Sequence, residues 1–184
     1  IPGAAKGAGL GIRFLKHLTR TKLLLHLVDI MPPDGSDPAA NVLAIEEELK
    51  AFSPTLAARP RWLILNKLDL IPEDEREEFC KKLYKRLKIT KKTPHFSIIA
   101  VSGEGTSALC EAIMTHIETE RTAQLENLAL AEREMEIQKA MQAEAREAIA
   151  ELAEARQRAR QEKQDNDDLD EDWDDGDVEV HYVK

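Results

Sequence analysis

Short apolar runs alternate with longer amphipathic segments along the first part of the chain. The apolar runs are rich in branched residues and occupy 22–30 (KLLLHLVDI), 61–66 (RWLILN) and 95–102 (HFSIIAVS). Strands that are apolar throughout are buried on both faces, and the helices between them serve as crossovers of a parallel sheet. The pattern therefore predicts an α/β fold with three parallel strands.

The segments between and after these runs carry helix signals. Segment 36–52 opens with residues that can cap a helix, and its apolar residues recur at spacings of three and four. Segment 72–87 places acidic residues in its first turn and basic residues in its last, as the helix dipole favours. Segment 106–120 again has apolar residues on one face. We predict a helix in each segment.

The composition changes after Thr119. Residues 120–162 contain no glycine or proline and are dominated by good helix formers, which predicts a long helix. Its apolar positions are sparse and hold no strict heptad, so a solvated or partner-dependent helix is favoured over a stable coiled coil. Residues 163–184 carry ten acidic and two basic side chains and are predicted to be disordered. The predicted parts are thus 1–119, 120–162 and 163–184.

The net charge is concentrated in this acidic tail. The 184 residues carry a formal net charge of -9, and the tail alone contributes -8 of it. This balance argues against general affinity for nucleic acid or anionic membranes. Cys80 and Cys110 show no metal-ligand spacing, so reduced structural thiols of a cytosolic protein are favoured. We expect no membrane span and no signal peptide. Because the chain begins at Ile1, we interpret it as part of a longer protein.

The stretch RWLILNKLDL (61–70) changes abruptly from apolar to polar where its strand is predicted to end. Ligands of such folds bind beyond the carboxyl ends of the strands. The Asp69 carboxylate has two acceptor oxygens that suit the two adjacent donors of guanine, and the Lys67 stem suits a purine face. The Asn66 amide can donate a hydrogen bond to the base and can also tie neighbouring loops together. Together with Leu68 these residues form N-K-x-D, the nucleotide-specificity motif of GTPases. A plain polar strand end is the alternative.

A second element follows the third apolar run. In GTPases a short Ser-Ala-x turn at this place presents a backbone N–H to the guanine carbonyl oxygen. Ala100 and Val101 fit that turn, whereas Ile99 stands where the pattern has serine, so we expect weaker support for the loop. An ordinary strand-to-helix turn is again the alternative.

The start of the chain supplies a third element. Ile1, Pro2 and Gly3 are similar to the end of the D-x-P-G motif, whose glycine amide touches the γ-phosphate. The following AAKGAGLGIRFLKHL resembles the Obg family of GTPases, in which Gly-x-Gly-Leu-Gly-x-x-Phe-Leu-x-His forms switch II and its helix. Members of that family usually have a few more residues between Pro-Gly and Ala-Ala. Either switch II is shorter here or residues are missing at this point, and we favour the second explanation.

The resemblance implies the C-terminal half of a Ras-like P-loop NTPase sheet, with strands 4, 5 and 6 of the order 2-3-1-4-5-6. It also implies binding of GTP, GDP and Mg²⁺, slow GTP hydrolysis, and a cytoplasmic, monomeric parent that acts in large ribosomal subunit biogenesis and in stress or growth control. No G-x-x-x-x-G-K-[ST] loop is present. We therefore expect the P-loop and the magnesium ligands upstream, no metal ligands here, and no activity from this chain alone. Its first strand would form an exposed apolar edge.

The sequence is also compatible with other interpretations. The long helix and acidic tail are compatible with a module that binds the ribosome or another partner, and the tail alone with a solubilising role. Another translational GTPase is a further alternative. Gly7, Gly9 and Gly11 only partly imitate a dinucleotide-binding fingerprint. His17 and His26 are interpreted as structural rather than catalytic.

Overall fold

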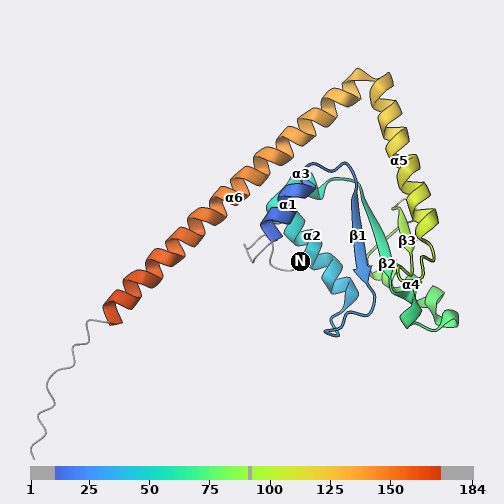
Figure 1. Cartoon of the computed structure of the whole chain (residues 1–184), viewed down its shortest axis with the longest axis horizontal. Helices are drawn as coiled ribbons and strands as arrows, with labels where there is room; N and C mark the ends of the chain where they lie inside the picture. The colour runs from blue at the N-terminus through green and yellow to red at the C-terminus, as the bar shows by residue number, and fades with distance from the viewer. Residues whose placement is uncertain (1–10, 91–92, 171–184) are drawn as a thin grey trace, which may run out of the picture. The chain divides into compact units, whose positions relative to one another are not determined.

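The computed structural model describes residues 11–90 and 93–170 and shows a small parallel sheet with helices on both faces (Figure 1). A boundary between Ala148 and Ile149, inside the last helix, divides the chain into two compact units. The elements are, in order, α1 (Gly11–Leu18), β1 (Leu24–Asp29), α2 (Pro38–Phe52), α3 (Pro54–Ala57), β2 (Arg61–Asn66), the 3₁₀ helix η1 (Leu68–Leu70), α4 (Glu73–Arg86), β3 (His95–Ser97), α5 (Thr106–Glu126) and α6 (Leu128–Asp170).

The three strands form a sheet of order β1-β2-β3, and both pairs are parallel. The register aligns Leu24 with Arg61 and, at the other end, Asp29 with Asn66. Helices connect successive strands, as a parallel sheet requires. The predicted α/β class, with three parallel strands and a long C-terminal helix, is therefore confirmed.

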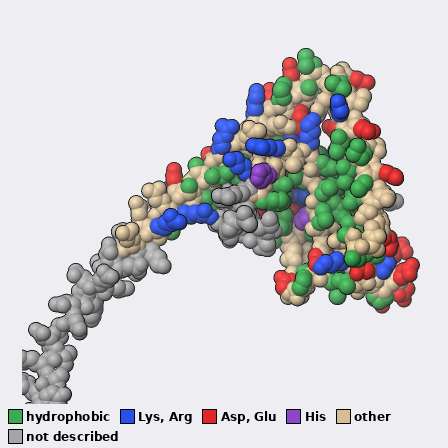
Figure 2. All heavy atoms as spheres, viewed as in Figure 1, with side chains coloured by type: hydrophobic (Ala, Val, Ile, Leu, Met, Phe, Trp, Pro, Cys, Tyr) green, Lys and Arg blue, Asp and Glu red, His purple; other side chains and the backbone are tan. Residues whose placement is uncertain are grey.

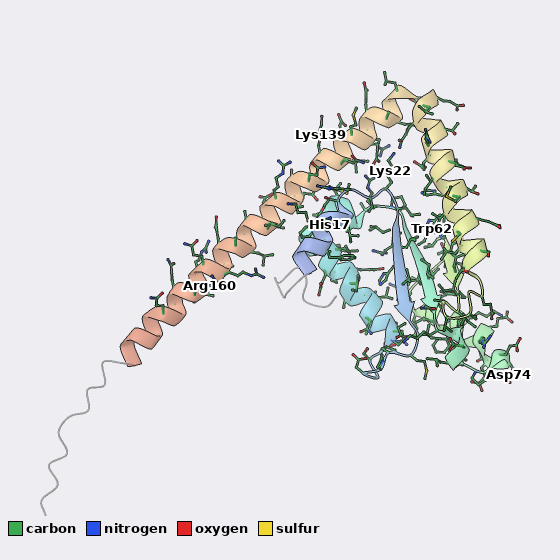
Figure 3. All side chains as sticks on the ribbon, viewed as in Figure 1. His17, Lys22, Trp62, Asp74, Lys139 and Arg160 are labelled. Carbon is green, nitrogen blue, oxygen red and sulfur yellow. The ribbon has the colours of Figure 1, made fainter. Side chains whose placement is uncertain are left out.

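β2 is the central strand and is buried on both faces, as its uninterrupted apolar sequence predicts. One face packs into a cluster with α2 and α4, which contains Val28, Ala39, Val42, Leu63, Leu65, Cys80 and Leu83. The opposite face packs against α5 through Trp62, Ile64, Ile98 and Leu109. Trp62 is labelled in Figure 3. Its ring centroid lies 5.5 Å from that of Phe96 and 5.3 Å from that of His116. This central strand positions the polar loop that follows it.

β1 lies at the edge of the sheet, and its burial is one-sided. Leu24 and Val28 are buried, whereas Leu25 is 41% exposed and Leu27 57% exposed. Burial on both faces was thus wrong for this strand, because the described elements cover only the face that carries Leu24 and Val28. Within residues 11–90 and 93–170, β1 pairs on one side only, as predicted for an exposed apolar edge. Figure 2 shows hydrophobic side chains gathered on the surface over the sheet between β1 and α5.

The long C-terminal helix is interrupted once. α5 ends at Glu126, and the Asn127 side chain then accepts a hydrogen bond from the Ala129 N–H (3.1 Å), which caps α6. The break therefore falls at a residue suited to an N-cap. α6 continues to Asp170, so the predicted disorder is wrong for 163–170, where the helix extends into the acidic segment. Residues 171–184 of the predicted tail lie outside the described residues.

The first part of α6 packs against the rest of its own unit. Met141 is fully buried and Ala145 nearly so. Arg59 donates two hydrogen bonds to the Glu134 carboxylate (2.6 and 2.7 Å), and this contact holds the pKa of Glu134 below its usual value. Most side chains of 128–148 are exposed, as predicted for a solvated helix, while Met141, Ala145 and the Arg59–Glu134 ion pair attach one side of it to the rest of the unit.

Glu144 provides a second attachment of α6. Its carboxylate accepts hydrogen bonds from the Ser53 hydroxyl (2.5 Å) and from the Thr55 N–H and hydroxyl (3.0 and 2.5 Å). Ser53 in turn caps α3 by accepting from the Leu56 N–H (2.9 Å). The negative carboxylate thus lies at the N-terminal end of α3, where the exposed amides favour it.

Candidate functional site

The polar loop after β2 begins at the carboxyl end of the central strand. Asn66 is the last residue of β2, and Lys67 adopts a left-handed conformation (φ 71°, ψ 34°) that is uncommon for a residue other than glycine. Leu68 is buried and fixes the base of η1, and the Leu70 N–H donates to the Lys67 carbonyl (3.1 Å). Asp69 is exposed. The apolar residues therefore hold the loop while the carboxylate faces solvent.

Asn66 joins this loop to the turn after β3. Its side-chain oxygen accepts a hydrogen bond from the Ala100 N–H (3.0 Å), across 34 residues of sequence. The carboxyl ends of neighbouring parallel strands meet at one edge of the sheet, so two loops distant in sequence become adjacent. The structure thus brings Asn66 and Ala100 together, as expected for an asparagine that ties neighbouring loops.

The turn after β3 is closed by its own backbone. The Ile99 N–H donates to the Glu104 carbonyl (3.0 Å), and the Gly103 N–H donates to the Ile99 carbonyl (2.9 Å). Ile99 is buried, whereas Ala100 and Val101 are exposed, Val101 to 89%. Among the described residues, the Val101 N–H has no hydrogen-bond acceptor. Ile99 therefore supports the turn by burial and backbone bonds in place of a serine hydroxyl.

Gly105 lets this turn pass close to β3. Its φ is +76°, and a Cβ placed on it would lie 2.5 Å from the Ser97 carbonyl oxygen. Only glycine fits both the backbone angle and the space. Sequence reasoning did not assign Gly105 a role, although its place just before a predicted helix was a usable signal.

Asp29 is a member of the site that sequence reasoning missed. It ends β1, opposite Asn66 in the register, and its Oδ2 lies 2.6 Å from the Lys67 Nζ. Its other oxygen, Oδ1, accepts a hydrogen bond from the Met31 N–H (3.0 Å). The available signal was its position at the polar end of the first apolar run, which corresponds to the position of Asn66 in the second.

The remaining candidates do not join the site. Ile1, Pro2 and Gly3 lie outside the described residues. His17 is exposed on α1 (Figure 3). The His26 Nδ1 is buried with no hydrogen-bond partner among the described residues, and burial, aided by the nearby Arg61 charge, lowers the pKa of His26 from 6.5 to about 4. His26 is therefore neutral near pH 7, beside an apolar cavity of about 280 Å³ that opens between α1, α2 and β1.

Residues 11–90 and 93–170 contain neither a metal-binding cluster nor a membrane-spanning helix. This part of the chain brings together no group of three or more His, Cys, Asp or Glu side chains suited to a metal ion. It also contains no helix with the length and apolar character needed to cross a bilayer.

Comparison with known proteins confirms the family resemblance. The chain is 59% identical over 113 residues to the protein named GTPase Obg from each of two strains of Acidithiobacillus ferrooxidans, ATCC 53993 and ATCC 23270. The match covers 61% of this chain and 30% of each relative, so the chain spans about a third of their length. No model of a known protein family matches the chain.

Proposed function

We propose that this chain is the C-terminal half of the GTP-binding domain of an Obg-type GTPase and supplies recognition of the guanine base. The observation that carries the proposal is the N-K-x-D loop at the end of a buried central strand, tied through Asn66 to the turn at Ala100. The 59% identity to GTPase Obg supports it. We assign residues 1–119 to the GTP-binding domain, 120–162 to a helical extension and 163–184 to an acidic tail.

Asp69 would select guanine. Its carboxylate is exposed beside the loop and has two acceptor oxygens, which match the ring N–H and the exocyclic amine of guanine. Adenine lacks this pair of donors, so the same carboxylate would disfavour it. A charged acceptor also makes stronger hydrogen bonds than a neutral one.

The other residues of the loops would shape the base pocket. The aliphatic stem of Lys67 would cover one face of the purine, and Asn66 would hold the two loops together while its amide faces the base. Because the Ala100 N–H is already bonded to Asn66, the Val101 N–H is the better donor for the guanine carbonyl oxygen. Leu68 and Ile99 would support the pocket from the core side.

The phosphates and the metal would be bound mainly by residues outside this chain. The described residues do not fit a magnesium site, since they form no cluster of acidic or other metal-binding side chains. We therefore place the P-loop and the magnesium ligands in another part of the protein. Within this chain, Ile1, Pro2 and Gly3 would form the edge of switch II beside the γ-phosphate.

The whole protein would hydrolyse GTP to GDP slowly and act in the cytoplasm as a monomer. Its proposed role lies in assembly of the large ribosomal subunit and in stress or growth control. The chain alone would be inactive, because it contains no P-loop sequence.

Replacement of Asp69 tests this proposal. Asp69→Asn exchanges one acceptor oxygen for a donor. The full-length protein should therefore lose affinity for GDP and gain affinity for xanthosine diphosphate (XDP), because xanthine carries a carbonyl where guanine carries its exocyclic amine. Asp74→Asn is the matched control, since Asp74 is an exposed acid in the first turn of α4 (Figure 3). Displacement of a fluorescent GDP measures both affinities. Unchanged GDP preference in Asp69→Asn would refute the assignment.

A partner-binding role of the C-terminal part is a second candidate. It is favoured by the boundary inside α6, beyond which residues 149–170 continue the helix as a separate unit. Deletion of 149–184 from the full-length protein should then weaken co-sedimentation with large ribosomal subunits more at low salt than at high salt. Equal co-sedimentation of the truncated and the full-length protein at both salt concentrations would contradict this role.

A further inference from the structure

We infer that Asp29 is a positioning residue for nucleotide binding, which holds the Lys67 side chain in the conformation that receives the purine. The inference rests on the proposed function. It assigns to the end of β1 a part in base recognition that the N-K-x-D motif does not include.

Contacts other than Lys67 hold the Asp29 carboxylate in position. Asp29 is aligned with Asn66 in the β1–β2 register, and the Ile30 N–H donates to the Asn66 carbonyl (3.3 Å) just beyond it. The Met31 N–H donates to Asp29 Oδ1, which turns the carboxylate so that Oδ2 meets the Lys67 Nζ at 2.6 Å. Both oxygens are therefore used, one for orientation and one for the ion pair.

Lys67 needs such an anchor because its backbone is held in place whereas its side chain is flexible. Its backbone is held in the left-handed region between Asn66 and the buried Leu68, while its side chain has four rotatable carbon–carbon bonds. Among the described residues, Asp29 is its ion-pair partner. An anchored ammonium limits the paths open to the stem, so less conformational freedom is lost when a base binds.

The exposure of this ion pair indicates that it contributes little to the stability of the fold. The side chains are 43% exposed for Lys67 and 30% exposed for Asp29. Ion pairs with this much solvent contact contribute little to folding. Removal of the charge should therefore leave the melting temperature nearly unchanged, so a change in nucleotide affinity would report the contact with Lys67 rather than a loss of fold.

Asp29→Asn in the full-length protein tests the inference. The asparagine Oδ1 still accepts from the Met31 N–H, so the variant removes the charge and keeps the local turn. We expect GDP to bind roughly two- to tenfold more weakly, mainly through faster release, with the ratio of GDP to XDP affinity unchanged. Asp34→Asn is the matched control, because Asp34 lies in the same loop and contacts Ser36 instead of Lys67.

A double-mutant cycle shows whether the effect passes through Lys67. In a Lys67→Ala background, Asp29→Asn should cause no further loss of affinity. Unchanged GDP affinity in the single variant, or an equal loss in both backgrounds, would overturn the inference. Asp69→Asn is measured alongside: if it leaves the base preference unchanged, the proposed function fails, whereas a preference switch without an Asp29 effect rejects the inference alone.

Discussion

Side chains at the carboxyl end of β2 fall into two groups. Asn66 and Lys67 are held by the protein itself, through Ala100 and Asp29 respectively. Asp69 is exposed, and no partner is found for it among the described residues. A ligand can thus engage the Asp69 carboxylate without first breaking a protein contact, while the neighbouring residues are already oriented.

Gly105 is a residue at which stability is expected to depend on backbone shape. Gly105→Ala should destabilise the full-length protein by about 1–3 kcal/mol, because the new Cβ would meet the Ser97 carbonyl oxygen at 2.5 Å in a left-handed backbone. Gly35→Ala is the control, since Gly35 has a similar φ of +69° and open space around it. Denaturant unfolding measures both, and an equal loss in the two variants would contradict the steric argument.

His26 should make stability depend on pH. Its pKa is lowered from 6.5 to about 4 in the folded chain, so between those pH values the unfolded chain binds the proton more tightly. The free energy of unfolding should therefore fall as the pH is lowered from 6.5 towards 4. Below about pH 4, protonation of His26 should cause no further loss of stability. His26→Leu should flatten the curve in this window, as followed by thermal unfolding. An unchanged pH dependence in His26→Leu would show that other groups cause the loss of stability in this window.

At the scale of elements, the helix and strand pattern was largely predictable from the sequence. Uninterrupted apolar runs predicted β1 and β2, and capping and charge signals predicted α2 and α4. The break at Asn127 and the packing of α6 were not predictable, because they depend on single side chains meeting partners far along the chain. Arg59 and Glu134, for example, are 75 residues apart.

The attachment of α6 through Arg59 and Glu134 gives an element-scale prediction. Their side chains are 6% and 14% exposed, so Glu134→Ala should leave a buried guanidinium unpaired and cost about 2–4 kcal/mol. The double variant Arg59→Leu/Glu134→Leu should lose less than the single one. Glu154→Ala, which removes an exposed pair with Arg158, serves as the control and should change little. Equal unfolding midpoints for Glu134→Ala and Glu154→Ala in the full-length protein would argue against the attachment.

At the scale of the whole molecule, the edge of β1 that no described strand covers is the main weakness. Leu25 and Leu27 are exposed on it, and the apolar cavity opens beside it. Unpaired apolar edges promote association between copies. The same placement was predictable from the sequence, since the strand order of the resembled fold leaves this strand without one partner.

The chain expressed alone should therefore associate or unfold without a sharp transition. Leu27→Lys should reduce association of the isolated chain, because a charged edge residue opposes strand pairing, whereas Leu43→Lys on α2 should have less effect although Leu43 is similarly exposed. Sedimentation velocity measures the species present. A monomeric, cooperatively unfolding chain of residues 1–184 would contradict this expectation.

Recognition of the guanine base by Asp69 is tested most directly by the ratio of XDP to GDP affinity in the full-length protein. The wild type should prefer GDP, and Asp69→Asn should shift the ratio towards XDP by more than roughly tenfold. An unchanged ratio in a correctly folded Asp69→Asn variant would contradict the proposed recognition.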